Sequence, residues 1–184
     1  MAQTPTTLIP LGFSAPEFSL TDTVSGKVKS LNELKSDKAT VIMFICNHCP
    51  FVVHIKDELV RLANDYISEG VSFIAISSND VEKYPQDGPV KMNEFANANQ
   101  FPFPYLYDET QEVAQAYSAA CTPDFSIFDA DLKCVYRGQL DDSRPSNGKP
   151  VNGKDIRETL DNILAGKPVS ADQKVSIGCN IKWK

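Results

Sequence analysis

The stretch Ala39 to Pro50 reads Ala-Thr-Val-Ile-Met-Phe-Ile-Cys-Asn-His-Cys-Pro, and it joins an uncharged apolar run to a Cys-x-x-Cys motif. Residues 39–45 are all β-branched or apolar and none is charged, which predicts a buried β-strand. Across residues 51–67, apolar side chains recur at helical spacing. Cys46 and Cys49 therefore lie at a predicted strand-to-helix junction.

A junction of this kind favours thiol–disulfide chemistry. The unpaired N–H groups in the first turn of a helix stabilise a thiolate, so we expect the pair to be more acidic than free cysteine. Two intervening residues bring the two sulfurs close enough to form a disulfide. Asn47 is a favourable helix N-cap residue, and it would place Pro50 in the first turn, where the missing N–H of proline costs nothing.

The chain has 184 residues, of which 42% are hydrophobic and 23% charged. These values predict one domain over residues 1–184, with a core at about 10–166 and a C-terminal tail at 167–184. The net charge is −6 and the Lys and Arg residues are scattered, so we do not expect a nucleic-acid partner. No apolar stretch is long enough for a bilayer and the N-terminus does not resemble a signal peptide, so we expect no membrane partner and a cytoplasmic location.

Five cysteines, at positions 46, 49, 121, 134 and 179, do not form the even framework of a secreted disulfide scaffold. In a reducing compartment, a close cysteine pair is usually catalytic or metal-binding.

The rest of the sequence predicts an α/β fold. The strand at 39–45, the helix at 51–67 and a buried strand at 71–77 form a right-handed βαβ unit with parallel strands. The other predicted elements are an N-terminal strand pair at 13–20 and 28–30, a brief helix capped by Ser30 and Glu33, helices at 89–98, 109–119 and 153–164, a strand at 105–107, and a hairpin of 125–128 with 133–139.

This order of elements, with Thr122-Pro123 ahead of the hairpin, resembles the thioredoxin fold in its peroxiredoxin-like form. The resemblance implies a central mixed β-sheet flanked by helices, with an N-terminal β-hairpin and a peroxiredoxin-like insertion. The segments that carry a narrower resemblance, to peroxiredoxin-like proteins of the alkyl hydroperoxide reductase and thiol-specific antioxidant group, are Cys46–Pro50, Ser78–Asp80, Cys121–Asp124, Arg137–Pro145 and Gly178–Lys184.

The resemblance assigns substrate binding to Thr122 and Pro123. In the thioredoxin fold the corresponding proline is cis and packs beside the redox cysteines, and the backbone before it pairs with the substrate like an added strand. Without the fold as context, base rates favour an ordinary trans bond. We expect a cis Pro123, with Thr122 presenting its amide and carbonyl.

The two related lineages assign the cysteines differently. By resemblance to thioredoxins, Cys46 is the exposed nucleophile and Cys49 resolves the mixed disulfide. By resemblance to peroxiredoxins, Cys49-Pro50 is the peroxidatic Cys-Pro pair. The remaining peroxide-binding residues of that family are replaced here by Ile42, Cys46 and Pro123, so transition-state stabilisation for peroxide cleavage is lost.

Asn47 and His48 stand where thioredoxins have Gly-Pro, and these positions tune redox potential. An imidazolium at His48 beside the thiolate would favour the reduced form and give a potential more oxidising than the roughly −270 mV of thioredoxin.

Other candidate residues have simpler interpretations. His54, four residues before Glu58 on a polar helix face, is expected to be solvated or locally paired, and Asp141–Pro145 reads as a turn with a local ion pair. Cys134 is expected to be structural, and Cys121 is a buried small residue or a third thiol. Cys179 is either a mobile resolving thiol or part of a tail that packs down through Ile181 and Trp183.

The sequence thus predicts a thiol–disulfide oxidoreductase in which Cys46 and Cys49 exchange disulfides with a protein or small-molecule thiol, with an unidentified electron donor and no cofactor or metal. One alternative is a peroxiredoxin-like peroxidase that uses Cys49. Another is a zinc-binding module in which Cys46, Cys49, His48 and Cys179 are ligands. A third is a degenerate scaffold that binds partners without turnover.

Overall fold

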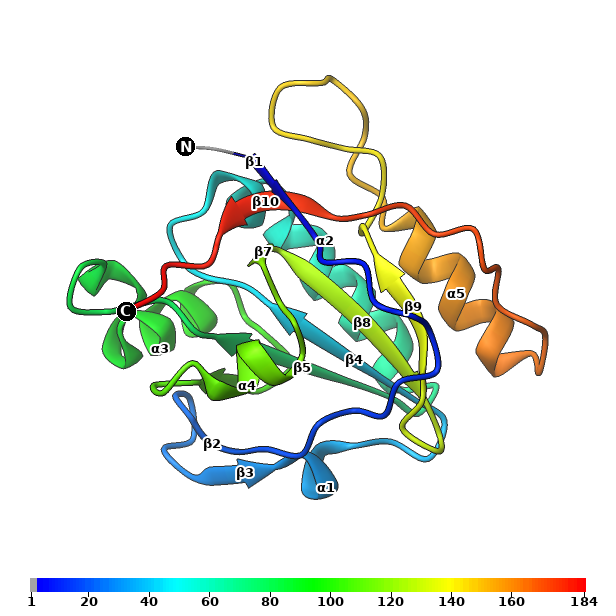
Figure 1. The fold of residues 1–184 in the computed structure, drawn as a ribbon, viewed down its shortest axis with the longest axis horizontal. Coiled ribbons are helices and arrows are strands. Elements are labelled where there is room, and N and C mark those ends of the chain that lie inside the picture. The colour runs from blue at the N-terminus through cyan, green and yellow to red at the C-terminus, as the bar shows by residue number, and fades with distance from the viewer. Residues whose placement is uncertain (1–2) are drawn as a thin grey trace.

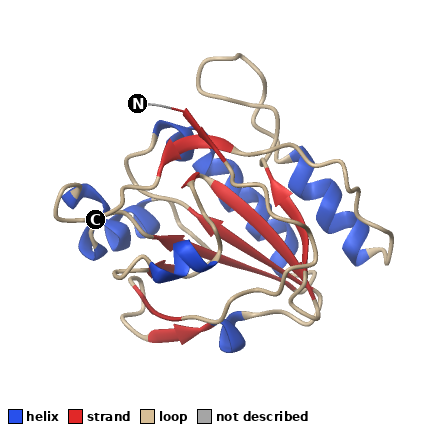
Figure 2. Ribbon diagram, viewed as in Figure 1, coloured by secondary structure: helices blue, strands red, loops and turns tan. Residues whose placement is uncertain are grey.

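A computed structural model describes residues 3–184 as an α/β fold (Figures 1 and 2). Within these residues, seven strands form a central sheet in the order β3-β2-β6-β5-β4-β8-β9, and three strands form a smaller sheet in the order β1-β10-β7. The strands are β1 (Gln3–Pro5), β2 (Ser19–Asp22), β3 (Val28–Ser30), β4 (Ala39–Phe44), β5 (Val71–Ser77), β6 (Tyr105–Tyr107), β7 (Cys121–Thr122), β8 (Asp124–Asp129), β9 (Cys134–Gly138) and β10 (Ile177–Asn180). The helices are α1 (Leu31–Leu34), α2 (Pro50–Ile67), α3 (Pro89–Ala98), α4 (Glu112–Ala116), α5 (Lys154–Leu164) and a 3-10 turn, η1 (Pro85–Asp87).

Strand β4 lies at the centre of the fold. All six of its residues are buried, as its uncharged sequence predicts. It pairs in parallel with β5 and antiparallel with β8, so the sheet is mixed and the predicted βαβ unit, with α2 as the crossover, is confirmed. The thioredoxin-like architecture therefore positions the Cys-x-x-Cys motif at the carboxyl end of the central strand.

The two faces of the sheet carry separate hydrophobic clusters. Because side chains alternate along a strand, Met43 of β4 faces the side covered by α2, α3 and α5. Ile42 and Phe44 face the opposite side, which α4 and the N-terminal segment cover. The predicted apolar stripe of α2 is buried against the first cluster, so burial of this face fixes the start of α2 beside the sheet.

Two predicted elements differ from the structure. The first N-terminal strand begins at Ser19 instead of residue 13, since the segment before it contacts the β8–β9 turn through an isolated bridge between Ser14 and Lys133. Helix α4 has five residues instead of the predicted 109–119. Gln111 and Ser118, with φ values of 66° and 51°, adopt left-handed conformations that bound this helix.

The small sheet joins the two ends of the chain. Strand β10, from the segment predicted to be a tail, lies between β1 and β7 and is antiparallel to both (Figure 1). The pattern of the sequence did not predict β1, β7 or β10, because these short segments carry no strand pattern of their own and pair only with partners remote in the sequence. The tail is therefore an integral part of the fold.

The polar face of α2 departs from expectation. Glu58 is 3% exposed and its carboxylate contacts both Arg61 and Arg157 at 2.8 Å. His54 was expected to be solvated or paired with Glu58, but its Nε2 is buried without a hydrogen-bond partner within the described part of the chain. The burial of Glu58 arises because Arg157 of α5 packs over this part of α2, which a local pattern does not reveal.

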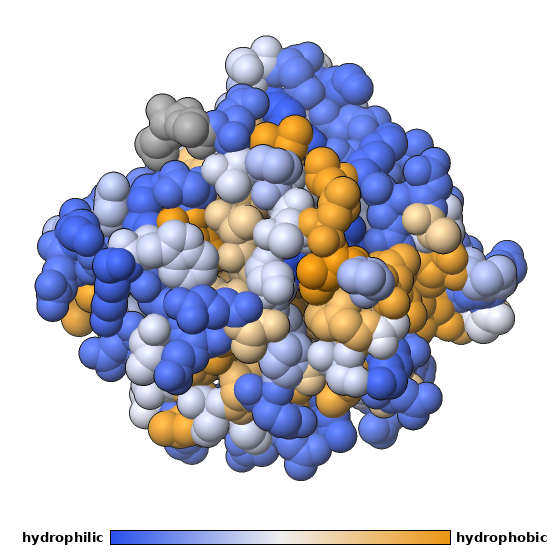
Figure 3. All heavy atoms as spheres, in the orientation of Figure 1, coloured by the Kyte–Doolittle hydropathy of each residue, from blue (hydrophilic) through white to orange (hydrophobic). Residues whose placement is uncertain are grey.

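The surface is mixed in character. On the face seen in Figure 3, hydrophobic residues form a band down the middle of the molecule with hydrophilic residues on both sides. Among the described residues, Leu8 is the most exposed large hydrophobic residue, at 78%.

Within residues 3–184, no helix combines the length and apolar character needed to cross a membrane.

The buried Glu58 generates a stability prediction. Replacing Arg157 with Met removes two hydrogen bonds to a carboxylate that is 4% exposed, so we expect a loss of about 2 kcal/mol in the free energy of unfolding. The matched control is Lys91→Met, which breaks the exposed Lys91–Glu94 pair and should cost below about 0.5 kcal/mol. Urea unfolding measures both, and equal losses in the two variants would contradict the assignment.

Candidate redox site

The two cysteines of the motif flank the turn between β4 and α2. Cys46 follows the strand, and Cys49 is itself the N-cap residue of α2, with Pro50 at the first helical position as predicted. The prediction that Asn47 caps the helix is wrong. Its side-chain Nδ2 instead donates to the Gln86 carbonyl, and its Oδ1 accepts a hydrogen bond from the Tyr105 hydroxyl.

Both sulfurs contact the loop that contains Pro123. The Thr122-Pro123 bond is cis, which confirms the prediction from resemblance. The Sγ of Cys46 lies 3.4 Å from the Thr122 hydroxyl oxygen, and the Sγ of Cys49 lies 3.2 Å from the Thr122 carbonyl oxygen. The structure therefore brings all four predicted residues together, from segments more than 70 positions apart.

A third sulfur completes the cluster. The Sγ of Cys179 lies 2.7 Å from the Sγ of Cys49, and the two residues are 130 positions apart in the sequence. Of the two alternatives for the tail, the packed one is correct: Ile181 is buried at 1% exposure, although Trp183 remains 40% exposed. All five cysteines are free in this structure.

Negative charge in the reduced site is favoured on Cys49. A hydrogen bond from Cys46 is the main cause that lowers the pKa of the Cys49 thiol to about 5, with a further contribution from Cys179, against the opposing effect of burial. The same hydrogen bond and burial raise the pKa of Cys46, and the carboxylate of Asp87 raises it further. Burial is the main cause that raises the pKa of Cys179 to about 12.

The expectation of an exposed Cys46 is wrong. Cys46 is 1% exposed and Cys49 is fully buried, because β10 and the Thr122-Pro123 loop lie against them. Sequence position at the mouth of the helix therefore does not identify the more acidic or the more accessible thiol.

Asp87, which the sequence analysis missed, organises the turn between the cysteines. It is fully buried. Its carboxylate accepts hydrogen bonds from the backbone N–H of Asn47 at 2.8 Å, from His48 Nδ1 at 2.6 Å and from Asn79 Nδ2 at 2.8 Å. The His48 ring stacks on Tyr84, with centroids 5.5 Å apart. His48 thus contacts a carboxylate instead of a sulfur, and within residues 3–184 it makes no hydrogen bond to either redox cysteine. The sequence signal nearest to Asp87 was the Ser78–Asp80 segment, which carries the family resemblance and contains Asn79.

Two other cysteines have the surroundings of structural residues. Burial is the main cause that raises the pKa values of Cys121 and Cys134 to about 12. Each sulfur donates to a nearby backbone carbonyl, of Pro123 and of Tyr136 respectively. Neither is therefore predisposed to form a thiolate.

The predicted ion pair in the segment 141–145 is wrong. Asp141 is 3% exposed and accepts hydrogen bonds from the amides of Asn152 and Gly153 at the start of α5, at 2.8 Å each. Arg144 donates to the carbonyls of Asp141 and Ser143. These hydrogen bonds anchor the start of α5, and none of them involves a cysteine.

Ligand atoms for a metal ion are also close together here. One atom each from Cys46, His48 and Asp87 lie within 4.8 Å of one another. Two of the four zinc ligands proposed from the sequence, Cys49 and Cys179, are not in this group. The carboxylate of Asp87 already accepts three hydrogen bonds, so hydrogen bonding accounts for the arrangement.

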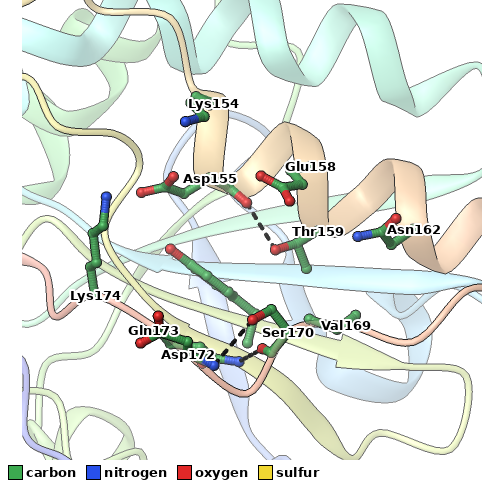
Figure 4. Close-up of a pocket in the computed structure, with 11 residues that line it drawn as sticks. Lys154, Asp155, Glu158, Thr159, Asn162, Val169, Ser170, Asp172, Gln173 and Lys174 are labelled. Atoms are coloured by element: carbon green, nitrogen blue, oxygen red, sulfur yellow. Dashed lines mark hydrogen bonds between the residues drawn. The ribbon is translucent and has the colours of Figure 1, made fainter.

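Another concave site is lined by none of the redox-site residues. It is formed by α5 and residues 169–174, and Figure 4 shows Asp155, Glu158 and Lys174 among its lining side chains. The residues lining it include no cysteine or histidine. Its polar groups are engaged locally, as in the hydrogen bond from Thr159 to the Asp155 carbonyl (Figure 4).

Fold and sulfur geometry together define a thioredoxin-fold protein with clustered redox-type cysteines. The chain belongs to the AhpC/TSA family, which it matches over residues 11–137. This matched region contains Cys46, Cys49 and Thr122-Pro123 but not Cys179.

Solved structures share this fold. An uncharacterized conserved protein from Geobacillus kaustophilus is 64% identical, with a TM-score of 0.99 over 100% of this chain and 97% of that one. A hypothetical protein from Sinorhizobium meliloti 1021 is 45% identical, with a TM-score of 0.96 over 98% of each chain. The thioredoxin domain of a thiol-disulfide oxidoreductase from Bacteroides vulgatus is 16% identical, with a TM-score of 0.63 over 83% of this chain and 99% of that one, and shares the fold. Among curated proteins, none matches the chain.

The hydrogen bonds at Cys49 predict the titration of the reduced protein. Thiolate ultraviolet absorbance should appear with a midpoint well below the about 8.5 of free cysteine. Cys46→Ala should raise that midpoint because it removes the main donor to Cys49, whereas Cys134→Ala should leave it unchanged. A wild-type midpoint at the ordinary cysteine value would refute the assignment.

The same shift predicts how stability depends on pH. The folded pKa of Cys49 lies below its unfolded value, so the folded state releases this proton at lower pH. The resulting stabilisation should be complete above pH about 8.5 and should be lost as the pH falls toward about 5. Urea unfolding of reduced wild type across this range should show a steeper rise with pH than Cys49→Ala, and identical slopes would exclude the effect.

Proposed function

We propose that this protein is a thiol–disulfide oxidoreductase in which Cys49 and Cys46 exchange disulfides with a protein or small-molecule substrate. The observation that carries the proposal is the position of the Cys49 sulfur, at the start of an 18-residue helix, 3.2 Å from the Thr122 carbonyl and hydrogen-bonded by a second thiol. Membership of the AhpC/TSA family supports redox chemistry of this class.

The structure favours Cys49 as the first nucleophile, which reverses the order expected from the thioredoxin resemblance. The thiolate is favoured on Cys49. Strand β10, which pairs with β7, directs the Cys179 sulfur to Cys49 and not to Cys46. In the proposed sequence, the Cys49 thiolate attacks one sulfur of the substrate disulfide and expels the other as a thiolate. Cys46 then loses its proton and attacks Cys49, which forms the Cys46–Cys49 disulfide and releases the second substrate thiolate.

Polar neighbours support this sequence. We propose that Thr122 orients both sulfurs through its hydroxyl and carbonyl oxygens, while Pro123 sets the loop against them. Asn47 and His48 act through Asp87, whose negative charge favours protonated Cys46 and so retains the resolving thiol in its neutral form. An external thiol donor restores the dithiol, and a reducing compartment such as the cytoplasm fits this requirement.

Trapping distinguishes the roles of the two cysteines. The Cys46→Ser variant, combined with Cys179→Ser to remove the other neighbouring thiol, should accumulate a mixed disulfide on Cys49 when incubated with glutathione disulfide. Mass spectrometry of the alkylated digest locates the adduct, and Cys134→Ser serves as the matched control. Accumulation only in a Cys49→Ser variant would restore Cys46 as the nucleophile. Absence of adducts on both cysteines would exclude the oxidoreductase.

A second candidate is a thiol peroxidase that uses Cys49, favoured by its lowered pKa and by Pro50 at the first helical position. Among the described residues, no arginine hydrogen-bonds to Cys49, and Arg137 is engaged by Ser126 and Asp124. Peroxide cleavage therefore lacks an evident guanidinium. Hydrogen peroxide should leave Cys46→Ser largely without sulfenic acid on Cys49, and rapid formation of it would establish the peroxidase instead.

A further inference from the structure

Strand β10 occupies the edge at which the thioredoxin fold is expected to accept a substrate strand. It is antiparallel to β7, with Cys179 opposite Thr122 and Asn180 opposite Cys121. In Figure 1 the C-terminal segment crosses beside β7 and the start of α2. The chain thus adds a strand of its own beside the cis Pro123.

The approach of the two backbones is very close at Gly178. A Cβ atom at this position would lie 2.0 Å from the Thr122 carbonyl oxygen and 2.6 Å from its carbon. Both are backbone atoms, so no side-chain rotation relieves the overlap. Residue 178 must therefore be glycine for β10 to pack in this position.

Hydrogen bonds hold the tail on both sides of Gly178. Before it, the Ser176 hydroxyl donates to the Pro123 carbonyl at 2.6 Å. After it, the Ile181 amide donates to the Ala120 carbonyl at 3.1 Å, and the Lys182 amide donates to Asn79 Oδ1 at 2.9 Å.

Gln111 acts as a clamp on the last residues. Its Nε2 donates to the carbonyls of Ser78 and Lys182, at 2.7 and 2.8 Å, and its Oε1 accepts from the Lys184 amide at 2.9 Å. Gln111 is 3% exposed, and both polar ends of its side chain bond to the tail.

We propose that β10 is an internal substrate strand, and that Cys179 is a third redox thiol that forms a disulfide with Cys49. This inference rests on the proposed function. It is carried by the 2.7 Å separation of the two sulfurs, by the pairing of β10 with β7 and by the fit of Gly178 against Thr122.

The reaction is an internal disulfide exchange. Once the substrate has oxidised the pair, the Cys179 thiol loses its proton and its sulfur attacks Cys49. The Cys46–Cys49 bond breaks, the Cys49–Cys179 bond forms, and Cys46 takes up a proton as a free thiol. One disulfide replaces another, so no further oxidant or reductant is needed.

The same geometry defines a substrate class. To reach Cys49, a substrate must displace β10 and pair with β7 in its place. Strand β10, which now occupies this position, has Gly178 immediately before Cys179. A larger residue in place of Gly178 would overlap the Thr122 backbone. The preferred substrate is therefore an extended polypeptide segment in which glycine precedes the reactive cysteine.

Disulfide mapping tests the third thiol. The full chain is incubated with glutathione disulfide, its free thiols are alkylated, and the digest is examined by mass spectrometry. Wild type should contain the Cys49–Cys179 disulfide, and Cys46→Ser should contain more of it because the competing partner is absent. Cys121→Ser is the matched control, since the Sγ of this β7 cysteine donates to the Pro123 carbonyl, and it should match wild type.

Release of the strand is tested with two further variants. Gly178→Val overlaps the Thr122 backbone, and Gln111→Asn shortens the clamp while tolerating the positive φ of that position. Each should raise the rate of reaction with glutathione disulfide, by roughly tenfold for Gly178→Val, because a larger fraction of molecules is open. Circular dichroism confirms folding, and Gln111→Asn decides the question if Gly178→Val does not fold.

The outcomes separate the two proposals. If the Cys46–Cys49 disulfide forms but Cys179 is never linked to Cys49 and the folded release variants react no faster, the inference fails and the proposed function stands. If neither cysteine of the pair forms any disulfide, both fail. A Cys49–Cys179 link together with faster release variants supports the inference.

Discussion

A single negative charge at the start of α2 is the constraint around which this site is built. A buried thiolate is costly unless several donors solvate it. Here the solvation comes from the Cys46 thiol, the Cys179 thiol and the first turn of the helix. The donors belong to the motif, the C-terminal strand and α2, so three separate segments contribute to stabilising the charge.

The site also requires the pairing of β10 with β7, which holds Cys179 beside Cys49. Strand β1 supports this pairing from the other side. Strand β1 covers the other edge of β10, with Thr4 opposite Gly178. Both ends of the chain therefore meet in one small sheet beside the sulfurs. The central sheet supplies the rigid base, since β4 places Cys46 and β8 follows directly after Pro123.

Sequence reasoning recovered what is encoded locally. The β4-α2-β5 unit follows from hydrophobic periodicity, the Ser30–Glu33 capping box from its spacing, and α3 from Pro89 at its first position. The cis Pro123 and its place beside the cysteines came from resemblance to a known fold.

What sequence reasoning missed depends on long-range packing. Asp87 lies 40 positions from Asn47, and Cys179 lies 130 positions from Cys49, so no local pattern joins them. Cys46 was expected to be exposed by resemblance to thioredoxins, because the segments that bury it were unknown. Glu58 reads as a surface residue until Arg157 of α5 is placed over it.

The small sheet also has a practical meaning for anyone handling this molecule. Residues 3–5 and 177–180 are adjacent strands, and the Lys184 amide is bonded inside the fold. An affinity tag or fluorescent fusion at either end would thus extend from the covering layer of the reactive sulfurs. Labels are better introduced at an exposed residue outside the small sheet, such as Lys91 on α3.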